Sequence, residues 1–393
     1  MTPKISPAHD KLLFTPGPLT TSQTVKQALL RDYGSRDLAF VEMVREIRRK
    51  LVELGGASTS EFTAVIMQGS GTFGLEAVVA TCVPRNGKLL VAVNGAYGRR
   101  IARMTQVLGV DLAVLEYPEN QPVRAADVAD RLEKDPRITH VCLVHCETTS
   151  GIINPLREVG EVVARAGKVF FVDAMSSFGG MPINLAQCHI DYLVSSANKC
   201  IEGVPGFSFV LARLKTFLQT KGWGRSLSLD LYDQYEAMEK DGQFRFTPPT
   251  SSLAAFYQAL LELEAEGGIA GRARRYQENF TVLMEGMARL GFRAYLAKEH
   301  MGHIITTFHY PEHPNFDFDA FYHRLSDAGY LIYLGKVGQA DCFRVGNIGR
   351  LFPSDMQSLV AAMEQALAAM GVELRASRAP RESRSEPTPA SSF

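Results

Sequence analysis

Seven short apolar segments recur between residues 62 and 212, and polar or helix-forming stretches separate them. Their sequences are FTAVIM, KLLVAV, LAVLEY, THVCLVH, KVFFVDA, DYLVSSA and FSFVLA. Most are apolar at consecutive positions rather than alternate ones, which is typical of strands buried on both faces. Helices fit between them, and Gly109 and Gly167 are placed to end two of these helices. The pattern predicts an α/β domain with a mainly parallel central sheet covered by helices.

The chain changes character after about residue 250. A long helical segment repeats apolar residues at spacings of three and four, including Tyr276, Leu283 and Met287. Shorter strand-like pieces follow (FRAYLA, HIITTFHY, YLIYLG and CFRVGN), together with helical stretches near 317–328 and 355–370. This mixture predicts a second, smaller α+β domain.

The length of 393 residues is sufficient for two domains. We expect an N-terminal arm over 1–15 that packs on the small domain, a large domain over 16–265 and the small domain over 266–374. Residues 375–393 are rich in Arg, Ser, Pro and Glu and lack apolar periodicity. Such a segment cannot offset its ordering entropy by burial, so a disordered tail is expected.

Charge and cysteine usage exclude several classes of protein. The 42 basic residues balance the 42 acidic residues, so no basic field favours a nucleic-acid partner. No apolar run is long enough to span a bilayer, and the first residues lack the apolar core of a signal peptide. The six cysteines form no CxxC pair and are too sparse for a disulfide scaffold. We therefore expect a cytoplasmic protein without a membrane partner.

A glycine-rich turn, QGSGTFG at 68–74, joins the first apolar segment to a helix. Small residues at a helix N-terminus allow backbone amides to approach a phosphate, although a plain tight turn would look the same. The turn also matches G-x-G-x-x-G, but the next strand ends in Asn94-Gly95 without the acidic residue that a dinucleotide ribose needs. No Lys-Ser or Lys-Thr follows, as a P-loop would require. A phosphate without a nucleotide is the remaining expectation.

Two charged residues follow later strands of the predicted sheet. Asp173 ends the apolar run KVFFVDA, and Lys199 follows DYLVSSA. Taken singly, the first could be a helix cap and the second a surface charge. Ligands of open α/β sheets bind beyond the carboxyl ends of the strands, where both residues and the glycine turn are expected to meet. A phosphate cradle, a carboxylate for a pyridine nitrogen and a lysine for a Schiff base together predict a pyridoxal 5′-phosphate site.

Several segments also resemble one enzyme family. They are LLFTPGPLTTS, QGSGTFGLEAV, NGAYGRR, HCETTSGIINP, VDAMSSFGG, SSANKCIEGVPGFSFV, RSLSLDLY, FTPPT and FRVGNIG. In this order, from Leu12 to Met370, the chain resembles the 2-aminoethylphosphonate–pyruvate transaminases, which are class V, fold-type I pyridoxal-phosphate enzymes. The resemblance implies an aminotransferase of phosphonate degradation that converts 2-aminoethylphosphonate and pyruvate to phosphonoacetaldehyde and L-alanine in two half-reactions.

The resemblance implies roles for the residues around the cofactor. Lys199 would form the Schiff base and, once released, move a proton as general base and acid. The cofactor phosphate would be bound by Ser70, Gly71 and Thr72. Thr247, in FTPPT, would reach the same phosphate from a partner subunit, which implies a homodimer with a shared active site.

The resemblance implies further contacts to the cofactor ring and the substrate. Tyr97 would stack on the pyridine ring, and the Thr148 hydroxyl would approach its phenolic oxygen. Arg344, in FRVGN, would bind the substrate's carboxylate or phosphonate through its bidentate fork. Arg36 is a possible second anion contact. The alternatives are that Tyr97 is a core tyrosine, Thr148 an ordinary strand-end threonine and Arg344 a surface arginine.

Other functions remain as alternatives. The chain could be another class V transaminase, such as an alanine–glyoxylate or serine–glyoxylate enzyme, because cofactor contacts are shared within the class. A nicotinamide-dependent oxidoreductase built on the glycine turn is weakened by the missing acidic residue. A non-catalytic regulator would not need both Lys199 and Asp173. His145 lies in no set with metal-ligand spacing, so we expect no metal.

Overall fold

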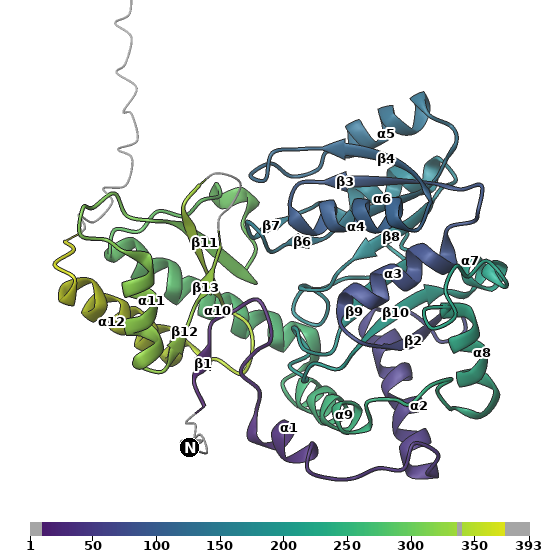
Figure 1. Ribbon diagram of the computed structural model, residues 1–393, viewed down its shortest axis with the longest axis horizontal. Coiled ribbons are helices and arrows are strands. Elements are labelled where there is room, and N and C mark those ends of the chain that lie inside the picture. Colours follow the sequence, from purple (N-terminus) through teal and green to yellow (C-terminus); the bar gives the residue numbers. More distant parts are fainter. Residues whose placement is uncertain (1–9, 336–339, 374–393) are drawn as a thin grey trace, which may run out of the picture.

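The protein folds into a large and a small lobe, shown in Figure 1 as a computed structural model. The structure describes residues 10–335 and 340–373. Most of the N-terminal arm expected over 1–15, and the tail expected over 375–393, lie outside the described residues.

The large lobe is built on one seven-stranded sheet that contains all seven apolar segments (Figure 1). Its strands are β2 (Phe62–Gln68), β3 (Lys88–Val93), β4 (Asp111–Glu116), β5 (Ile138–Val144), β8 (Val169–Asp173), β9 (Tyr192–Ser196) and β10 (Phe207–Arg213). The order is β2-β10-β9-β8-β5-β3-β4, and only β10 runs antiparallel to its neighbours. The expected mainly parallel α/β sheet is confirmed. Of the two edge strands, β2 is buried almost throughout, whereas β4 has one buried residue, Ala113, and otherwise exposed or partly exposed ones.

The helices of the large lobe pack on this sheet or on one another through their apolar faces. They are α1 (Gln23–Ala28), α2 (Leu38–Leu54), α3 (Gly71–Cys82), α4 (Ala96–Val107), α5 (Ala125–Lys134), α6 (Leu156–Arg165), α7 (Leu214–Phe217), α8 (Leu231–Asp241) and α9 (Thr250–Ala265). α2 and α8 contact β2, α3 contacts β9 and β10, α4 contacts β3, and α6 contacts β8. A short hairpin, β6 (Cys146–Glu147) with β7 (Ile152–Ile153), and the 3₁₀ turn η1 (Leu218–Thr220) complete the lobe. No helix of the described part is both long and apolar enough to cross a membrane.

The small lobe has its own sheet and core. Its elements are α10 (Gly268–Arg289), η2 (Lys298–His300), β11 (Ile305–His309), α11 (Phe318–Asp327), β12 (Tyr330–Leu331), β13 (Tyr333–Leu334), β14 (Cys342–Gly346) and α12 (Pro353–Ala369). β11, β14 and β13 form an antiparallel sheet, and Leu283, Met287 and Phe343 lie in a core separate from that of the large lobe. β1 (Leu12–Leu13) pairs in parallel with β12, and Phe14 enters the same core. The chain near its N-terminus is thereby held on the small lobe.

Two strand predictions in this lobe are wrong in detail. FRAYLA (292–297) is not a strand: only Ala294 forms a bridge, to Phe308, although the segment runs beside β11. YLIYLG is divided into β12 and β13, which pair with different partners, β1 and β14. Both segments lie at sheet edges, where few ladder bonds form and the sequence specifies pairing weakly.

Helix α10 belongs to both lobes. It begins beside the large lobe and ends in the small one (Figure 1). Arg272, near its start, donates to the carbonyl of Cys200, whereas Met287, near its end, lies in the small-lobe core. The domain boundary expected at 265–266 therefore stays a prediction, since α10, which follows it, contacts both lobes.

Candidate active site

A cavity of about 190 Å³ lies at the carboxyl ends of β5, β8 and β9. Six of the predicted residues line it: Ser70, Gly71, Thr72, Tyr97, Asp173 and Lys199. Its other lining residues are Leu75, Arg100, Val144, Cys146, Met175, Ser176, Ser196 and Asn198. They come together because parallel strands deliver the loops that follow them to one edge of the sheet.

One end of the cavity is suited to an anion. Ser70 is the N-cap of α3, but its hydroxyl makes no capping bond, and the first amides of this helix face the turn. A Cβ at Gly71 would overlap the end of the Met175 side chain, so any larger residue would require Met175 to move. Arg100 adds a positive charge: its Nη1 lies 3.5 Å from the Thr72 hydroxyl, and its guanidinium lies over the Tyr97 ring at 4.9 Å.

Asp173 ends β8 with its carboxylate at the cavity. The side chain is buried, and Oδ1 accepts a hydrogen bond from the amide of Met175 at 2.9 Å. Burial raises the pKa of Asp173 to about 7, and the nearby Glu147 carboxylate adds to the effect, while Lys199 and Arg100 oppose it. A carboxylate in this position is stabilised by a cationic partner inside the cavity.

Lys199 approaches the cavity from the loop after β9. Its Nζ donates to the carbonyl of Pro16 at 2.5 Å, so the segment near the N-terminus crosses the amine. A Cβ on Gly17 would lie 2.6 Å from Nζ, so a side chain there would crowd the amine. Gly17 also has φ +119°, a backbone conformation that favours glycine. Burial lowers the pKa of Lys199 to about 8, which brings a neutral, reactive amine within reach at physiological pH.

Glu147 holds the start of helix α4, which carries Tyr97. Helix α4 lacks a capping side chain of its own at Gly95. The buried Glu147 instead accepts from the amides of Tyr97 (3.1 Å) and Gly98 (3.3 Å) through Oε2, and from the Thr149 hydroxyl (2.6 Å) through Oε1. A carboxylate at a helix N-terminus is favourable, so Glu147 fixes the first turn of α4 and with it the Tyr97 ring.

Replacing Gly95 with alanine is expected to lower stability by about 1 to 3 kcal/mol, because the new methyl would overlap the Glu147 side chain. Gly95 has φ 176°, an extended conformation open to any residue, so the effect is steric. Thermal unfolding of the cofactor-free protein measures it. The matched control is Gly34→Ala, whose methyl would meet only Asp37 Cβ at 3.7 Å. Equal unfolding midpoints for the two variants would contradict the role of Glu147 as a cap.

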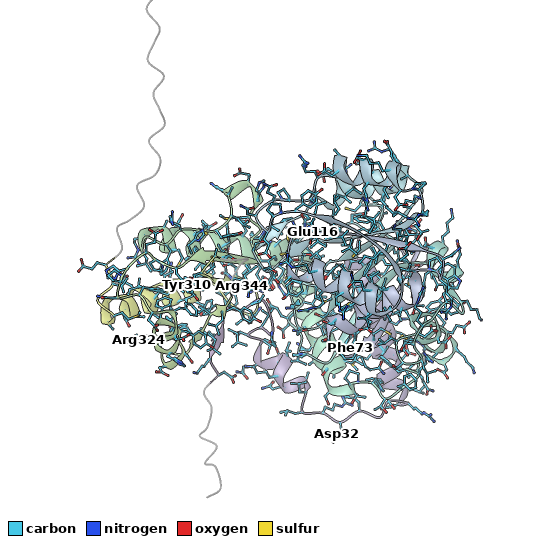
Figure 2. The ribbon with its side chains drawn as sticks, turned by 45° about the horizontal axis from the view of Figure 1, so that its top comes forward. Asp32, Phe73, Glu116, Tyr310, Arg324 and Arg344 are labelled. Carbon is cyan, nitrogen blue, oxygen red and sulfur yellow. The ribbon has the colours of Figure 1, made fainter. Side chains whose placement is uncertain are left out.

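Arg344 and Thr148 lie beside the cavity rather than in its lining. Arg344 Nη1 donates to the backbone carbonyl of Thr148 and Nη2 to that of Leu334, both at 2.9 Å. The guanidinium lies 4.7 Å from the Tyr333 ring centroid, and burial lowers its pKa. Nε has no hydrogen-bond partner within the described residues. In Figure 2 this side chain lies on the part of the small lobe nearest the large lobe.

The structure does not bring Thr247 or Arg36 to the cavity. Both line a separate surface hollow over 35–36 and 243–248. This hollow is linked to the glycine turn through Gln68, whose Nε2 donates to the carbonyls of Phe246 (3.0 Å) and Thr247 (3.3 Å). Within one chain, Thr247 therefore lies near the turn without facing the cavity.

Comparison with known proteins shows the family of this chain. The family model "Aminotransferase class-V" matches residues 22–327. The chain belongs to this family. The protein is also 50% identical over 350 residues to proteins named 2-aminoethylphosphonate–pyruvate transaminase from Bacillus cereus (strain ATCC 10987 / NRS 248) and Bacillus anthracis, covering 89% of this chain and 96% of each relative.

Solved structures of aminotransferases have the same fold. The pyridoxamine–pyruvate aminotransferase of Mesorhizobium loti superimposes with a TM-score of 0.85 at 25% identity, covering 93% of this chain and 94% of that one. The alanine–glyoxylate aminotransferase of Nostoc sp. gives 0.86 at 26% identity, with 93% and 98% covered. This chain is therefore a fold-type I aminotransferase, as the sequence predicted.

His145, a residue that could suggest a metal site, has a structural role here. His145 pairs through Nδ1 with the Ser177 hydroxyl at 2.8 Å, and burial lowers its pKa to about 4, so it is a neutral structural residue. Among the described residues, no group of three or more His, Cys, Asp or Glu side chains could hold a metal ion.

The sequence interpretation missed Arg100, Glu147 and the Pro16 carbonyl. Arg100 had a usable signal, because a residue three positions after Tyr97 on a helix shares its face. Glu147 is adjacent in sequence to the predicted Thr148, but its contact with α4 is long-range. A backbone carbonyl such as that of Pro16 leaves no signal in the side-chain pattern.

Proposed function

We propose that this aminotransferase binds pyridoxal 5′-phosphate in the cavity and transfers the amino group of 2-aminoethylphosphonate to pyruvate, giving phosphonoacetaldehyde and L-alanine. The observation that carries the proposal is the arrangement of charge: Asp173 and the anion-binding turn lie in one cavity with the Lys199 amine. The relatives with 50% identity carry the name of this activity.

The donor set fits this cofactor. Three groups suit a phosphate: the Ser70 hydroxyl, which makes no capping hydrogen bond, the amides at the start of α3, and the Arg100 guanidinium. Asp173, with its raised pKa, suits a protonated pyridine nitrogen, because that cation would stabilise its ionised form. Tyr97 supplies an aromatic face at the same cavity.

When bound, pyridoxal phosphate supplies a carbonyl group that accepts the amino group and a ring that stabilises the electrons released at the amine-bearing carbon. Lys199 would hold the cofactor between turnovers, and its freed Nζ would move the proton, which the lowered pKa of Lys199 favours. The Pro16 carbonyl can hold the freed amine. Asp173 would keep a proton on the pyridine nitrogen.

Arg344 is the proposed anchor for the acidic group of each substrate. Its Nε is the guanidinium atom without a partner in the described part of the chain, while the two Nη atoms are fixed by the carbonyls of Thr148 and Leu334. A guanidinium held in this way is oriented in advance for a phosphonate or a carboxylate. Thr148 retains its proposed role beside the cofactor's phenolic oxygen.

We also propose a cytoplasmic homodimer with a shared active site. Large exposed side chains occur on the segments around the glycine turn and the hollow of Thr247: Phe73 is 49% exposed, Phe246 46% and Leu227 76%. Phe73 is labelled on the large lobe in Figure 2. A second subunit could cover these side chains and bring its Thr247 to the phosphate end. The six cysteines, all within the described residues, form no disulfide, in keeping with a reducing compartment.

The first experiment is a titration followed by the visible absorbance of the purified, cofactor-loaded protein. We expect 2-aminoethylphosphonate and L-alanine to bleach the band of the lysine-bound cofactor, and L-serine to leave it. Pyruvate added after the phosphonate should restore the band and yield L-alanine. Bleaching by serine instead of the phosphonate would favour a serine–glyoxylate type of transaminase, and a protein that takes up no cofactor would contradict the proposal.

A further inference from the structure

An ionic cluster lies outside the cavity, next to the segment 197–204 that carries Lys199, which we call the lysine loop. It consists of Glu202, Glu266, Arg272 and Arg275, and we call it the Glu202 cluster. Arg272 is 0% exposed, Glu202 3% and Arg275 7%. Arg275 bonds to Glu202 at 2.8 Å and to Glu266 at 2.7 Å, and Arg272 bonds to Glu266 at 2.6 Å. Glu266 is partly exposed, with 17% of its side chain accessible, whereas the other three charges are buried. Burying charges is costly even when they are paired, and hydrophobic packing would serve stability as well or better.

The cluster holds the backbone that carries Lys199. The amide of Glu202 donates to the Lys199 carbonyl at 2.7 Å, and Arg272 donates to the Cys200 carbonyl at 2.6 Å. Glu202 has φ +65°, a conformation that a non-glycine residue keeps only when its surroundings enforce it. Arg275 and the Tyr276 hydroxyl, bonded to the Glu202 carboxylate, supply that enforcement.

The same cluster holds the segment after the Arg344 strand. Arg275 Nη1 donates to the carbonyls of Gly349 (2.5 Å) and Leu351 (2.9 Å). The Tyr276 hydroxyl accepts from the amide of Gly349 at 3.3 Å. This segment directly follows β14, which carries Arg344, so one guanidinium joins the lysine loop to the strand of the proposed substrate anchor.

The segment near the N-terminus completes the connection. Gly346, at the end of β14, donates to the carbonyl of Phe14 at 2.9 Å, and Arg350 donates through its amide to that of Thr20 at 2.8 Å. Between these two points lies Pro16, whose carbonyl accepts from Lys199 Nζ. The backbone of Lys199 and its amine are therefore both tied to the 344–351 region.

We propose that Arg275 and Tyr276 are positioning residues that fix the Lys199 amine relative to the Arg344 guanidinium, and so match the site to an amine with an anionic group at a set distance. The proposal rests on the proposed function, in which Arg344 holds the acidic group. A substrate held at one end reacts only if the lysine reaches its amine-bearing carbon at the other end, and a displacement of 1 Å costs roughly 100-fold in rate.

The test uses Arg275→Lys, which keeps the charge but cannot make the five hydrogen bonds of the guanidinium. Its matched control is Arg289→Lys on the same helix, where the guanidinium pairs only with the exposed Glu364. We expect Arg275→Lys to lower the single-turnover rate per cofactor-loaded site, at saturating 2-aminoethylphosphonate, by roughly 100-fold. KM should stay within about threefold, since Arg344 is retained. The control should match the parent protein.

A second measurement is independent of the bound cofactor. Amide hydrogen exchange of the cofactor-free protein should become faster at 197–204 and 344–351 in Arg275→Lys, and not in Arg289→Lys. If Arg275→Lys does not fold, Tyr276→Phe removes only the bridging hydroxyl and should lower the rate per loaded site about tenfold.

An unchanged rate per loaded site in Arg275→Lys or Tyr276→Phe would overturn the positioning role, even if hydrogen exchange were faster. Failure of the proposed function has a different result, namely a parent protein that does not react with 2-aminoethylphosphonate. In that case the variants are compared on whichever anionic amine the parent accepts, and the same criterion applies.

Discussion

Replacing Lys199 with alanine is expected to lower transamination at least ~1000-fold while leaving the protein folded. The loss follows from geometry, because Lys199 supplies the only amine at the cavity among the residues that line it. The Asp173 carboxylate is not free to replace it as a base, since it accepts a hydrogen bond from Met175 and is assigned to the proposed pyridine contact. The measurement is pyruvate-dependent turnover of 2-aminoethylphosphonate, with circular dichroism to verify folding.

The matched control is Lys221→Ala, because Lys221 pairs with Glu236 on the surface of the large lobe. This variant should keep the parent's turnover and folding. A small primary amine added to Lys199→Ala should restore part of the rate, because it fits the space that the side chain leaves. Full turnover in Lys199→Ala without added amine would refute the mechanism.

The sheet was predictable from the sequence because its strands are buried on both faces. β8, for example, has to be apolar at consecutive positions, and KVFFVDA is unambiguous. The small lobe was less predictable: β12 and β13 consist of two residues each, and β12 pairs with β1 near the other end of the chain, whereas β13 pairs with β14. Short edge strands depend on tertiary contacts that no local pattern records.

The cavity was predictable where position along the strands decides the chemistry. Asp173, Lys199 and the glycine turn meet because each follows a strand of one sheet. The contacts of Arg344 with Thr148, and of Lys199 with Pro16, join residues 196 and 183 positions apart. Contacts of this kind depend on how the lobes pack, and so they emerge only from the structure. The role of Thr247 depends on a second subunit and stays a prediction.

Asp173 is expected to lower the stability of the cofactor-free protein while serving its activity. The raised pKa, about 7 instead of its usual value near 3.8, means that the folded protein holds a proton that the unfolded chain releases. Stability should therefore fall as pH rises from about 4 to 7, and above that range the burial of the charge costs roughly 4 kcal/mol. Below about pH 4 both states are protonated and the cost vanishes.

Replacing Asp173 with asparagine should therefore stabilise the cofactor-free protein and inactivate the enzyme. We expect urea unfolding to show a gain of up to ~4 kcal/mol at pH 8 and about a third of that at pH 5. Turnover of the loaded enzyme should fall roughly 100- to 1000-fold, because an amide cannot keep the pyridine nitrogen protonated. The control Asp230→Asn alters the cap of α8 and should stay within about 1 kcal/mol of the parent protein. If Asp173→Asn were less stable than the parent at pH 8, the carboxylate would be stabilising in the empty cavity, and its burial would not be the cost that the cofactor relieves.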